Sequence, residues 1–284
     1  MKNFIKILKI PLIVSLIITI ACAGEHPGKK AARDLGWEVG FQAYTFHMFT
    51  FAEALLKGDS AGVTVVEAYP GQEIGGGISG TTEFTMDQET RNKMKELLAS
   101  NGMQLKAYGV AVPEDSAGWK QLFDFAKDMG IGVITSEPSY EVLDLVEQLA
   151  DEYDIKVAFH NHPAPSLYWN PDTVLTALEG RSMNLGVCAD IGHWIRSGLD
   201  PIECLKKLEG RIIILHFKDL NEKAAEAYDV PWGTGVADIP AVLAELKRQG
   251  FKGLFDIEYE HNWYNNVPEI KESVENFYDM VAEL

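Results

Sequence analysis

The chain has 284 residues, of which 46% are hydrophobic, and 42 acidic residues outnumber 25 basic ones, so that the formal net charge at pH 7 is −17. Such an acidic surface repels phosphate backbones, which argues against a nucleic-acid substrate.

The first 21 residues are typical of a secretory signal peptide. Three lysines precede an apolar run from Ile10 to Ile20, and small Ala21 follows. The run is shorter than the ~20 residues that a membrane span requires. Cys22 directly after Ala21 resembles the lipobox of bacterial lipoproteins, although Thr19 replaces the usual leucine. We therefore expect an exported protein, anchored by a lipid at Cys22 and facing the periplasm or cell surface, with ordinary cleavage as the alternative.

Residues 22–36 are polar and contain Gly and Pro, which predicts a tether. The 263 residues left without the leader match one barrel domain of the usual ~250 residues, over 37–284, and leave no room for a second. Without the three leader lysines, 22 basic residues face 42 acidic ones, a formal charge of −20. Cys188 and Cys204 lie in apolar surroundings, which favours buried free thiols over a disulfide.

Eight strand-then-helix units follow one another in the remaining chain. The alternation predicts a single (β/α)8 TIM barrel with eight parallel strands. Residues 72–85 form a Gly-rich connection that is long for a barrel, so they are either a lid over the catalytic face or a disordered surface loop. The predicted strands are residues 39–45, 63–70, 103–111, 131–137, 155–162, 185–190, 211–219 and 252–259.

Four of these strands end on residues that bind metals. They deliver Glu137, Asp190, His216 and Glu258. Asp190 alone is equally explained as a helix cap, but glutamates are poor caps and a histidine in an apolar strand needs a partner. Because the carboxyl ends of barrel strands converge, these side chains predict an oxygen-rich site for one divalent ion, with Mn²⁺, Mg²⁺ or Co²⁺ favoured over zinc.

The strand-end motifs resemble a known family. Glu137 after a strand, the D-x-G-H of Asp190 to His193, the H-x-K-D of His216 to Asp219, a later WGTG and a terminal IEYE are similar to the xylose isomerase-like barrels, grouped as sugar phosphate isomerases/epimerases. The resemblance implies the fold and one divalent metal ion. It also implies a ligand set of Glu137, Asp190, His216 and Glu258, the two glutamates as acid and base, and substrate contacts from His162 and His193.

Further residues are placed near the substrate by their position in the strands. Lys218 shares a strand face with His216, where it would neutralise an enediolate or form an ion pair with a carboxylate. Other cavity-wall positions are equally explained as packing. The predicted substrate-binding set is His162, His193, Lys218, His160 and Glu67, and weaker wall candidates are His47, Trp194 and Trp232.

The predicted function is a metal-dependent sugar isomerase or epimerase, which abstracts a carbon-bound proton and forms an enediolate. The substrate is expected to be a neutral carbohydrate, because only Lys218 and Arg196 stand near the motifs as cations for a phosphate. The first alternative is a lyase that performs β-elimination on 3-keto-glycosides, since YPGQEIG and IEYEHNW resemble that branch. The second is a sugar-binding lipoprotein without catalysis.

Overall fold

The computed structural model describes residues 25–284. The predicted signal peptide and the lipidation site at Cys22 lie outside the described residues. Within the described part, no helix combines the length and hydrophobicity needed to cross a bilayer.

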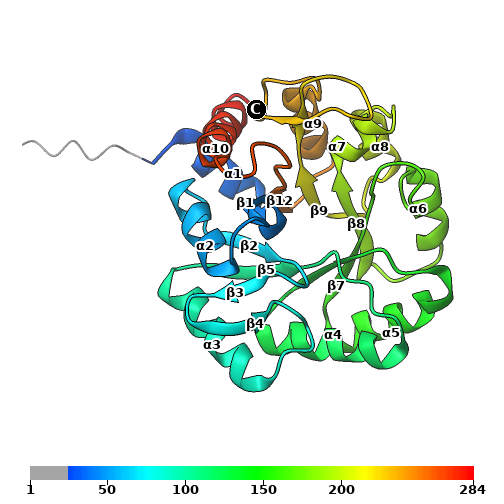
Figure 1. The fold of residues 1–284 in the computed structure, drawn as a ribbon. Coiled ribbons are helices and arrows are strands. Elements are labelled where there is room, and N and C mark those ends of the chain that lie inside the picture. The colour runs from blue at the N-terminus through cyan, green and yellow to red at the C-terminus, as the bar shows by residue number, and fades with distance from the viewer. Residues whose placement is uncertain (1–24) are drawn as a thin grey trace, which may run out of the picture.

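Eight parallel strands close into a barrel surrounded by helices, which confirms the predicted (β/α)8 fold (Figure 1). Each strand pairs with its neighbours in chain order, and the last strand pairs with the first. The strands are β1 (Trp37–Gln42), β2 (Val65–Ala68), β5 (Gln104–Tyr108), β6 (Val133–Ser136), β7 (Lys156–His160), β8 (Leu185–Asp190), β9 (Ile212–Phe217) and β12 (Gly253–Ile257). Several are shorter than predicted, so Glu137, His162 and Glu258 lie just beyond strand ends.

The strands are buried on both faces, because side chains pack inside the barrel as well as against the helices. A small inner cluster contains Val65, Ala107, Ala158, Cys188, Ile214 and Leu254. Gly40 makes room for a polar residue inside, since a Cβ there would lie 2.1 Å from Asp256 Oδ1.

The helices bury one apolar stripe each, and most begin at a side-chain cap. Asp87 and Asp115 accept backbone hydrogen bonds at two such starts. The helices around the barrel are α2 (Phe51–Ser60), α3 (Gln88–Ser100), α4 (Ser116–Met129), α5 (Leu143–Tyr153), α6 (Pro171–Leu178), α7 (Ile191–Arg196), α8 (Pro201–Lys207), α9 (Ile239–Arg248) and α10 (Val267–Ala282), with short 3₁₀ turns η1 (Ala43–Phe46) and η2 (Tyr140–Val142).

The predicted tether is wrong over most of the part that the structure describes. Pro27–Leu35 forms helix α1, which packs against α10 (Figure 1). Gly28 lies so close to α10 that a Cβ would meet the Tyr278 carbonyl oxygen at 1.7 Å. The α1 residues Lys29 and Arg33 line a hollow together with residues 62–64, which precede β2, and with Val65, its first residue, so α1 lies at the amino end of the barrel.

The Gly-rich connection is an ordered hairpin of β3 (Glu73–Gly75) and β4 (Ile78–Thr81). It is fixed from below, because Ile74 is fully buried and the Tyr108 hydroxyl donates to the Thr82 carbonyl oxygen at 2.7 Å. A Cβ at Gly75 would meet Thr50 at the start of α2 at 2.5 Å. The hairpin therefore lies against the outer helices and is neither disordered nor a lid in this structure. A second short hairpin joins β10 (Asp219–Leu220) to β11 (Asp229–Val230).

Candidate active site

Asp190 ends β8 and performs two tasks with its two oxygens. Its Oδ1 accepts from the His193 backbone N–H at 2.7 Å and so caps α7. Its Oδ2 faces the barrel mouth, where Lys218 Nζ lies at 3.0 Å and His193 Nε2 at 3.4 Å. Asn161 holds the Asp190 backbone through two hydrogen bonds of 2.9 Å. The cap and the functional role that the sequence left open are thus compatible.

Charge around Asp190 keeps it ionised. Burial opposes ionisation, but His193, Lys218 and His160 outweigh it and hold the pKa of the Asp190 carboxyl well below its usual range. Burial in turn lowers the pKa of His193 well below its usual value. The glycine of the D-x-G-H motif is needed for packing, because a Cβ at Gly192 would lie 2.8 Å from Lys218 Cβ.

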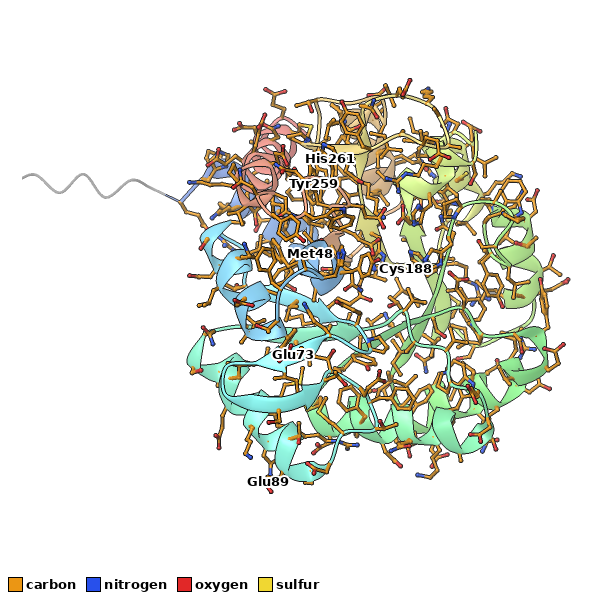
Figure 2. The ribbon with its side chains drawn as sticks, in the orientation of Figure 1. Met48, Glu73, Glu89, Cys188, Tyr259 and His261 are labelled. Carbon is orange, nitrogen blue, oxygen red and sulfur yellow. The ribbon has the colours of Figure 1, made fainter. Side chains whose placement is uncertain are left out.

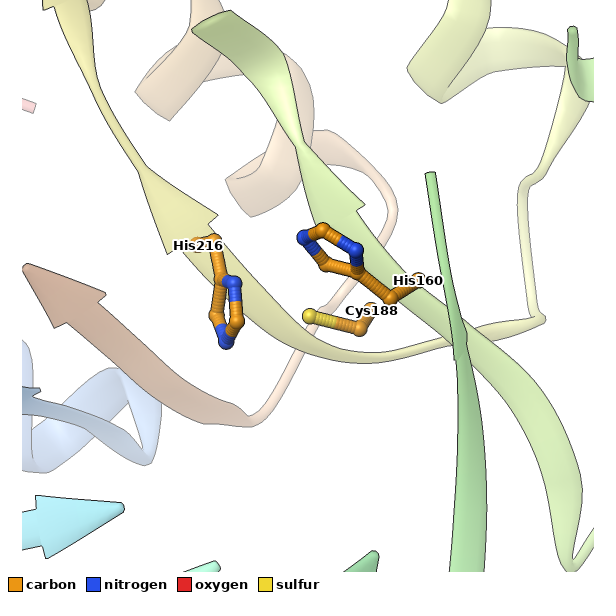
Figure 3. Close-up of side chains that lie close together, drawn as sticks. All are labelled: His160, Cys188 and His216. Atoms are coloured by element: carbon orange, nitrogen blue, oxygen red, sulfur yellow. The ribbon is translucent and has the colours of Figure 1, made fainter. Parts of the chain in front are cut away.

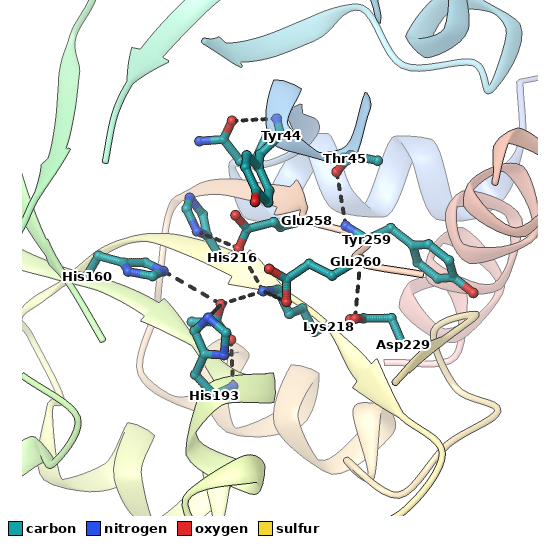
Figure 4. A network of polar contacts seen from close by, with 12 residues as sticks. Tyr44, Thr45, His160, His193, His216, Lys218, Asp229, Glu258, Tyr259 and Glu260 are labelled. Carbon is teal, nitrogen blue, oxygen red and sulfur yellow. Dashed lines mark hydrogen bonds and ion pairs between the residues drawn. The ribbon is translucent and has the colours of Figure 1, made fainter. Parts of the chain in front are cut away.

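Lys218 forms the centre of a carboxylate cluster (Figure 4). Its fully buried Nζ lies 2.8 Å from Glu258 Oε2 and 3.1 Å from Glu260 Oε2, in addition to Asp190. Burial opposes its charge, but the three carboxylates raise the pKa of Lys218 well above its usual value. Glu258 Oε2 also lies 3.1 Å from His216 Nδ1. Although burial opposes ionisation of Glu258, Lys218 and His216 hold its pKa well below the usual range.

Glu137 follows β6 and faces two histidines from the end of β7. Its Oε1 contacts Nδ1 of His162 and lies 3.2 Å from Nδ1 of His160. Burial would raise the pKa of Glu137, but these two contacts lower it to about 2. His160 bridges towards the rest of the site, because its Nε2 lies 3.6 Å from Asp190 Oδ2. With a carboxylate at each ring nitrogen, the pKa of His160 is raised despite its burial.

The site offers donor atoms that suit a divalent ion. Four buried atoms of the site, His160 Nε2, Asp190 Oδ2, His216 Nδ1 and Glu258 Oε2, have ion-pair contacts to one another or to Lys218 but make no hydrogen bond of good geometry within residues 25–284. Ligand atoms of His160, Asp190, His193 and Glu258 lie within 4.8 Å of one another. Two carboxylate oxygens with imidazole nitrogens match the ligands of a divalent metal. Glu137 belongs to an adjacent group with His160 and His162, so His160 connects the two groups.

Glu67 is a correction to the predicted substrate contacts. It is fully buried inside the barrel, where its Oε2 lies 2.8 Å from His216 Nε2 and its Oε1 accepts from Thr135 Oγ1. A carboxylate on the outer nitrogen of a metal-binding histidine fixes the orientation of the ring. Buried Asp256 lies beside it, and burial followed by the charge of Glu67 raises the pKa of Asp256 well above its usual range. The contacts of Glu67 within residues 25–284 therefore orient His216 and do not face the cavity.

Cys188 lies next to two of the site histidines. Its thiol forms a buried group with His160 and His216, as Figure 3 shows. Burial raises the pKa of Cys188 to about 12, so the thiol stays protonated. Cys188 packs in the inner cluster of the barrel with Val65, Ala158 and Ile214. Both Cys188 and Cys204 are free and buried, as predicted.

An ion-pair chain beside Lys218 was missed at the sequence level. Arg196 of α7 lies 2.7 Å from Glu260 Oε2 and 3.0 Å from Asp229 Oδ2. Burial raises the pKa of Asp229 to about 7, although Lys218 and Arg196 oppose it. Glu260 stands two residues after Glu258, and its place on the same face of an extended segment was the available signal.

A cavity of about 330 Å³ opens at this end of the barrel. It is lined by Gln42, Tyr44, Tyr69, Pro70, Gly109, Val110, His162, Glu258 and Glu260. Of the predicted substrate-binding residues, half-exposed His162 lines it, whereas the others are buried away from the cavity lining: His160, His193, Lys218 and Glu67. Trp194 and Trp232 are 1% exposed and serve as packing residues.

Two curated proteins match part of the sequence. The rhizopine catabolism protein MocC of Rhizobium meliloti is 26% identical over 138 residues, which cover 43% of this chain and 42% of MocC. An inosose dehydratase of Clostridium botulinum is 28% identical over 138 residues, 42% of this chain and 45% of that protein. Each match spans less than half of the relative's own length.

Solved structures match nearly the whole barrel. An uncharacterised protein from Parabacteroides distasonis ATCC 8503 is 39% identical with a TM-score of 0.70, over 84% of this chain and 97% of its own. A D-tagatose 3-epimerase-like protein has a TM-score of 0.67 at 19% identity, over 87% and 98% of the two chains. The IOLI protein, solved with a bound zinc atom, has a TM-score of 0.65 at 18% identity, over 87% and 98%.

The family assignment rests on the sequence as a whole. The model of the xylose isomerase-like TIM barrel matches residues 57–280, which include every strand of the barrel except β1. The closed eight-stranded barrel is the fold that this match requires. The chain therefore belongs to the family of xylose isomerase-like TIM barrels.

Proposed function

We propose that the protein is an enzyme that removes a proton from the carbon beside a carbonyl group of a neutral sugar. The observation that carries this is the placement of Glu137 and Glu258. They follow β6 and β12, which lie opposite each other in the closed barrel of eight strands. A sugar between them would present a carbon to a carboxylate on either side.

The first candidate reaction is isomerisation or epimerisation. Both glutamates are held ionised by neighbouring histidines or Lys218, which is the form that accepts a proton. One glutamate removes the proton, and return to the adjacent carbon gives isomerisation, whereas return to the opposite face gives epimerisation. Lys218 has three carboxylate partners, so its charge is already balanced before substrate binds.

We propose a bound divalent metal as the cofactor. Asp190 and Glu258 would hold it together with His160 or His193, whose ligand atoms lie within 4.8 Å of theirs. His216 would join them because its Nδ1 lies 3.1 Å from Glu258 Oε2, whereas Glu137 belongs to the adjacent group with His160 and His162. The ion would polarise the substrate carbonyl as a Lewis acid. The oxygen-rich donors favour Mn²⁺, Mg²⁺ or Co²⁺, and the zinc of the IOLI protein makes zinc the competing choice.

The cavity supports an uncharged substrate. Its lining contains Glu258 and Glu260 but neither Lys nor Arg. Arg196 and Lys218 are both buried against carboxylates. A phosphate ester would meet negative charge without a free cation, so we propose a neutral carbohydrate.

A second candidate reaction is β-elimination, in which loss of the proton expels an oxygen from the next carbon. The match to an inosose dehydratase favours it. His162 also favours it, because this half-exposed imidazole lines the cavity in contact with Glu137 and would donate a proton to the departing oxygen. A keto-glycoside would lose its aglycone in this way.

The two reactions separate in deuterated water. Metal-loaded protein would be incubated with free ketoses, aldoses and 3-keto-glycosides. Deuterium incorporation with the glycosidic bond intact supports isomerisation or epimerisation, whereas release of the aglycone supports elimination. Either activity should fall at least 100-fold in Glu137→Gln or in Glu258→Gln. Full activity in both variants would overturn the proposal, because each reaction needs a glutamate as base.

A further inference from the structure

We propose that an aromatic wall beside the cavity is an outer subsite for a second, uncharged ring, joined by a glycosidic bond to the sugar in the cavity. The aromatic wall consists of Tyr44, His47, Tyr69 and Trp263. This inference rests on the proposed function for the sugar in the cavity, and it adds that the substrate is a glycoside with an aromatic or sugar ring as its second part.

The wall is built by three neighbouring strands. Its residues lie in the segments after β1, β2 and β12, and β1 pairs with both other strands. The Tyr44 and His47 rings stack with centroids 4.6 Å apart, and Trp263 meets His47 edge-on at 4.2 Å. Tyr69 meets Tyr44 edge-on at 5.3 Å. These contacts hold the rings as one surface, which reduces the entropy lost when a ligand stacks on them.

Tyr44 joins this surface to the site. Its ring lines the cavity, yet 39% of the residue is exposed. Figure 4 shows Tyr44 over Glu258. Burial, followed by Glu260 and Glu258, raises the pKa of Tyr44, so it presents a neutral phenol. A ligand that leaves the cavity along Tyr44 therefore meets His47 and Trp263 next.

The cavity is small and opens beside Tyr44. About 330 Å³ is at the lower limit of the ~300–1,000 Å³ typical of small-molecule sites. A second ring on the substrate can therefore extend from the cavity onto the exposed side of Tyr44. The acidic groups Glu258 and Glu260 at the cavity disfavour an anionic second part, whereas the hydrophobic face of a sugar or an aryl ring stacks on aromatic side chains.

Most exposed apolar side chains lie at the same end of the barrel as the cavity. Nine large hydrophobic side chains are exposed in residues 25–284, and only Leu56 and Met183 lie away from the carboxyl ends of the strands. Figure 2 locates Met48 and His261 in the loops after β1 and β12. Clustered exposed apolar groups mark a binding surface. The seven at this end are Tyr44, Met48, Val112, Tyr140, Leu167, Tyr228 and Tyr264.

The test compares two probes that differ only in the second ring, methyl β-D-glucopyranoside and phenyl β-D-glucopyranoside. Their affinities for the purified protein would be measured by calorimetry. We expect the phenyl glucoside to bind about three- to tenfold more tightly, as one aromatic contact provides. In Trp263→Ala this preference should disappear, and in Trp263→Phe it should persist. The methyl glucoside, which fills only the cavity, is the reference for each variant.

Tyr264→Ala is the matched control from the same loop, because its ring packs beside Phe49 and outside the aromatic wall. It should keep the preference for the phenyl glucoside. If Trp263→Ala does not fold, His47→Ala makes the same prediction, since His47 supports Trp263. Equal affinity of the two probes for wild-type protein, or an unchanged preference in the variants, would overturn the subsite. Weak binding of both probes would do so as well.

Two further results distinguish the outer subsite from a dimer interface and from failure of the proposed function. A dimer of the wild-type protein that Trp263→Ala dissociates, without any phenyl preference, would make the aromatic wall a contact between copies and refute the subsite. Failure of the proposed function has a different signature. It would show as no solvent deuterium in any sugar and no aglycone release, while a Trp263-dependent phenyl preference would still support the subsite.

Discussion

The two carboxylate oxygens of Asp190 have different roles, one in capping a helix and the other in the candidate metal site. Asp190 Oδ1 caps α7, while Oδ2 faces the barrel mouth, 3.0 Å from Lys218 Nζ. The cap fixes the side-chain rotamer, and a fixed donor loses little entropy when it binds an ion. A substitution that keeps the cap but removes the charge separates the two roles.

Asp190→Asn tests the metal site in that way. We expect about one divalent ion per chain in the wild-type protein and at least tenfold weaker retention in Asp190→Asn, since a neutral amide is a poor ligand. Cys204→Ala is the control, because this buried thiol lies in α8 and belongs to none of the possible metal-binding groups of the described residues. Elemental analysis after dialysis measures both. Equal metal in wild type and Asp190→Asn would refute the metal site.

Asp229 predicts a pH dependence of stability. Burial raises its folded-state pKa to about 7, above the ~3.9 of an unfolded aspartate. The folded state therefore binds the proton more tightly, and this stabilisation is complete below about pH 4 and lost as the pH rises through 7. Relative to Asp229→Asn, the wild-type free energy of unfolding should fall by up to about 1.4 kcal/mol per pH unit in this window. Melting curves at pH 5 to 8 measure it, and a constant difference would contradict it.

Residues at strand ends were predictable, but their partners were not. Apolar runs in the sequence made four strand-end residues identifiable: Glu137, Asp190, His216 and Glu258. The pairing of Glu67 with His216 spans 149 positions, and that of Lys218 with Glu260 spans 42. Such contacts depend on how the barrel closes, and Glu67 fits the pattern of a strand end as well as Glu137 does. What distinguishes Glu67 from Glu137 is its complete burial beside His216, which the sequence did not indicate.

At the scale of elements, α1 shows where hydrophobic patterning fails. Its inward face consists of Gly28, Ala31, Ala32 and Leu35, of which only Gly28 and Ala32 are fully buried, so its apolar stripe is made mostly of small side chains. Small residues allow the two backbones to approach closely. The eight barrel strands were easier to predict, because each must fill two buried faces and therefore reads as a continuous apolar run.

Gly28→Ala measures this close approach. In an open helix position the change would stabilise by up to about 1 kcal/mol. Here the new Cβ would overlap the Tyr278 carbonyl, so we expect a loss of about 1–3 kcal/mol in the free energy of unfolding. The melting temperature should fall by several degrees, whereas exposed Lys30→Ala should change it little. An unchanged or raised melting temperature in Gly28→Ala would contradict the packing of α1 on α10.

At the scale of the whole molecule, the location of the protein is our proposal from its leader. If Cys22 carries a lipid, the wild-type protein should sediment with membranes, and Cys22→Ala should release it. Cell fractionation with detection of the protein measures the change, and Cys204→Ala controls for loss of a cysteine. An identical distribution of wild type and Cys22→Ala would refute the lipoprotein hypothesis.

The position of α1 at the amino end of the barrel would then set the orientation of the enzyme. Five residue steps separate Cys22 from Pro27, a leash of at most about 18 Å. Because α1 packs on α10 at the amino end of the barrel, so short a linker to a lipid at Cys22 would keep that end close to the bilayer. The opening with the aromatic wall is at the other end. The cavity would then face away from the membrane. The enzyme would bind molecules that diffuse in from the surrounding medium in preference to those dissolved in the lipid.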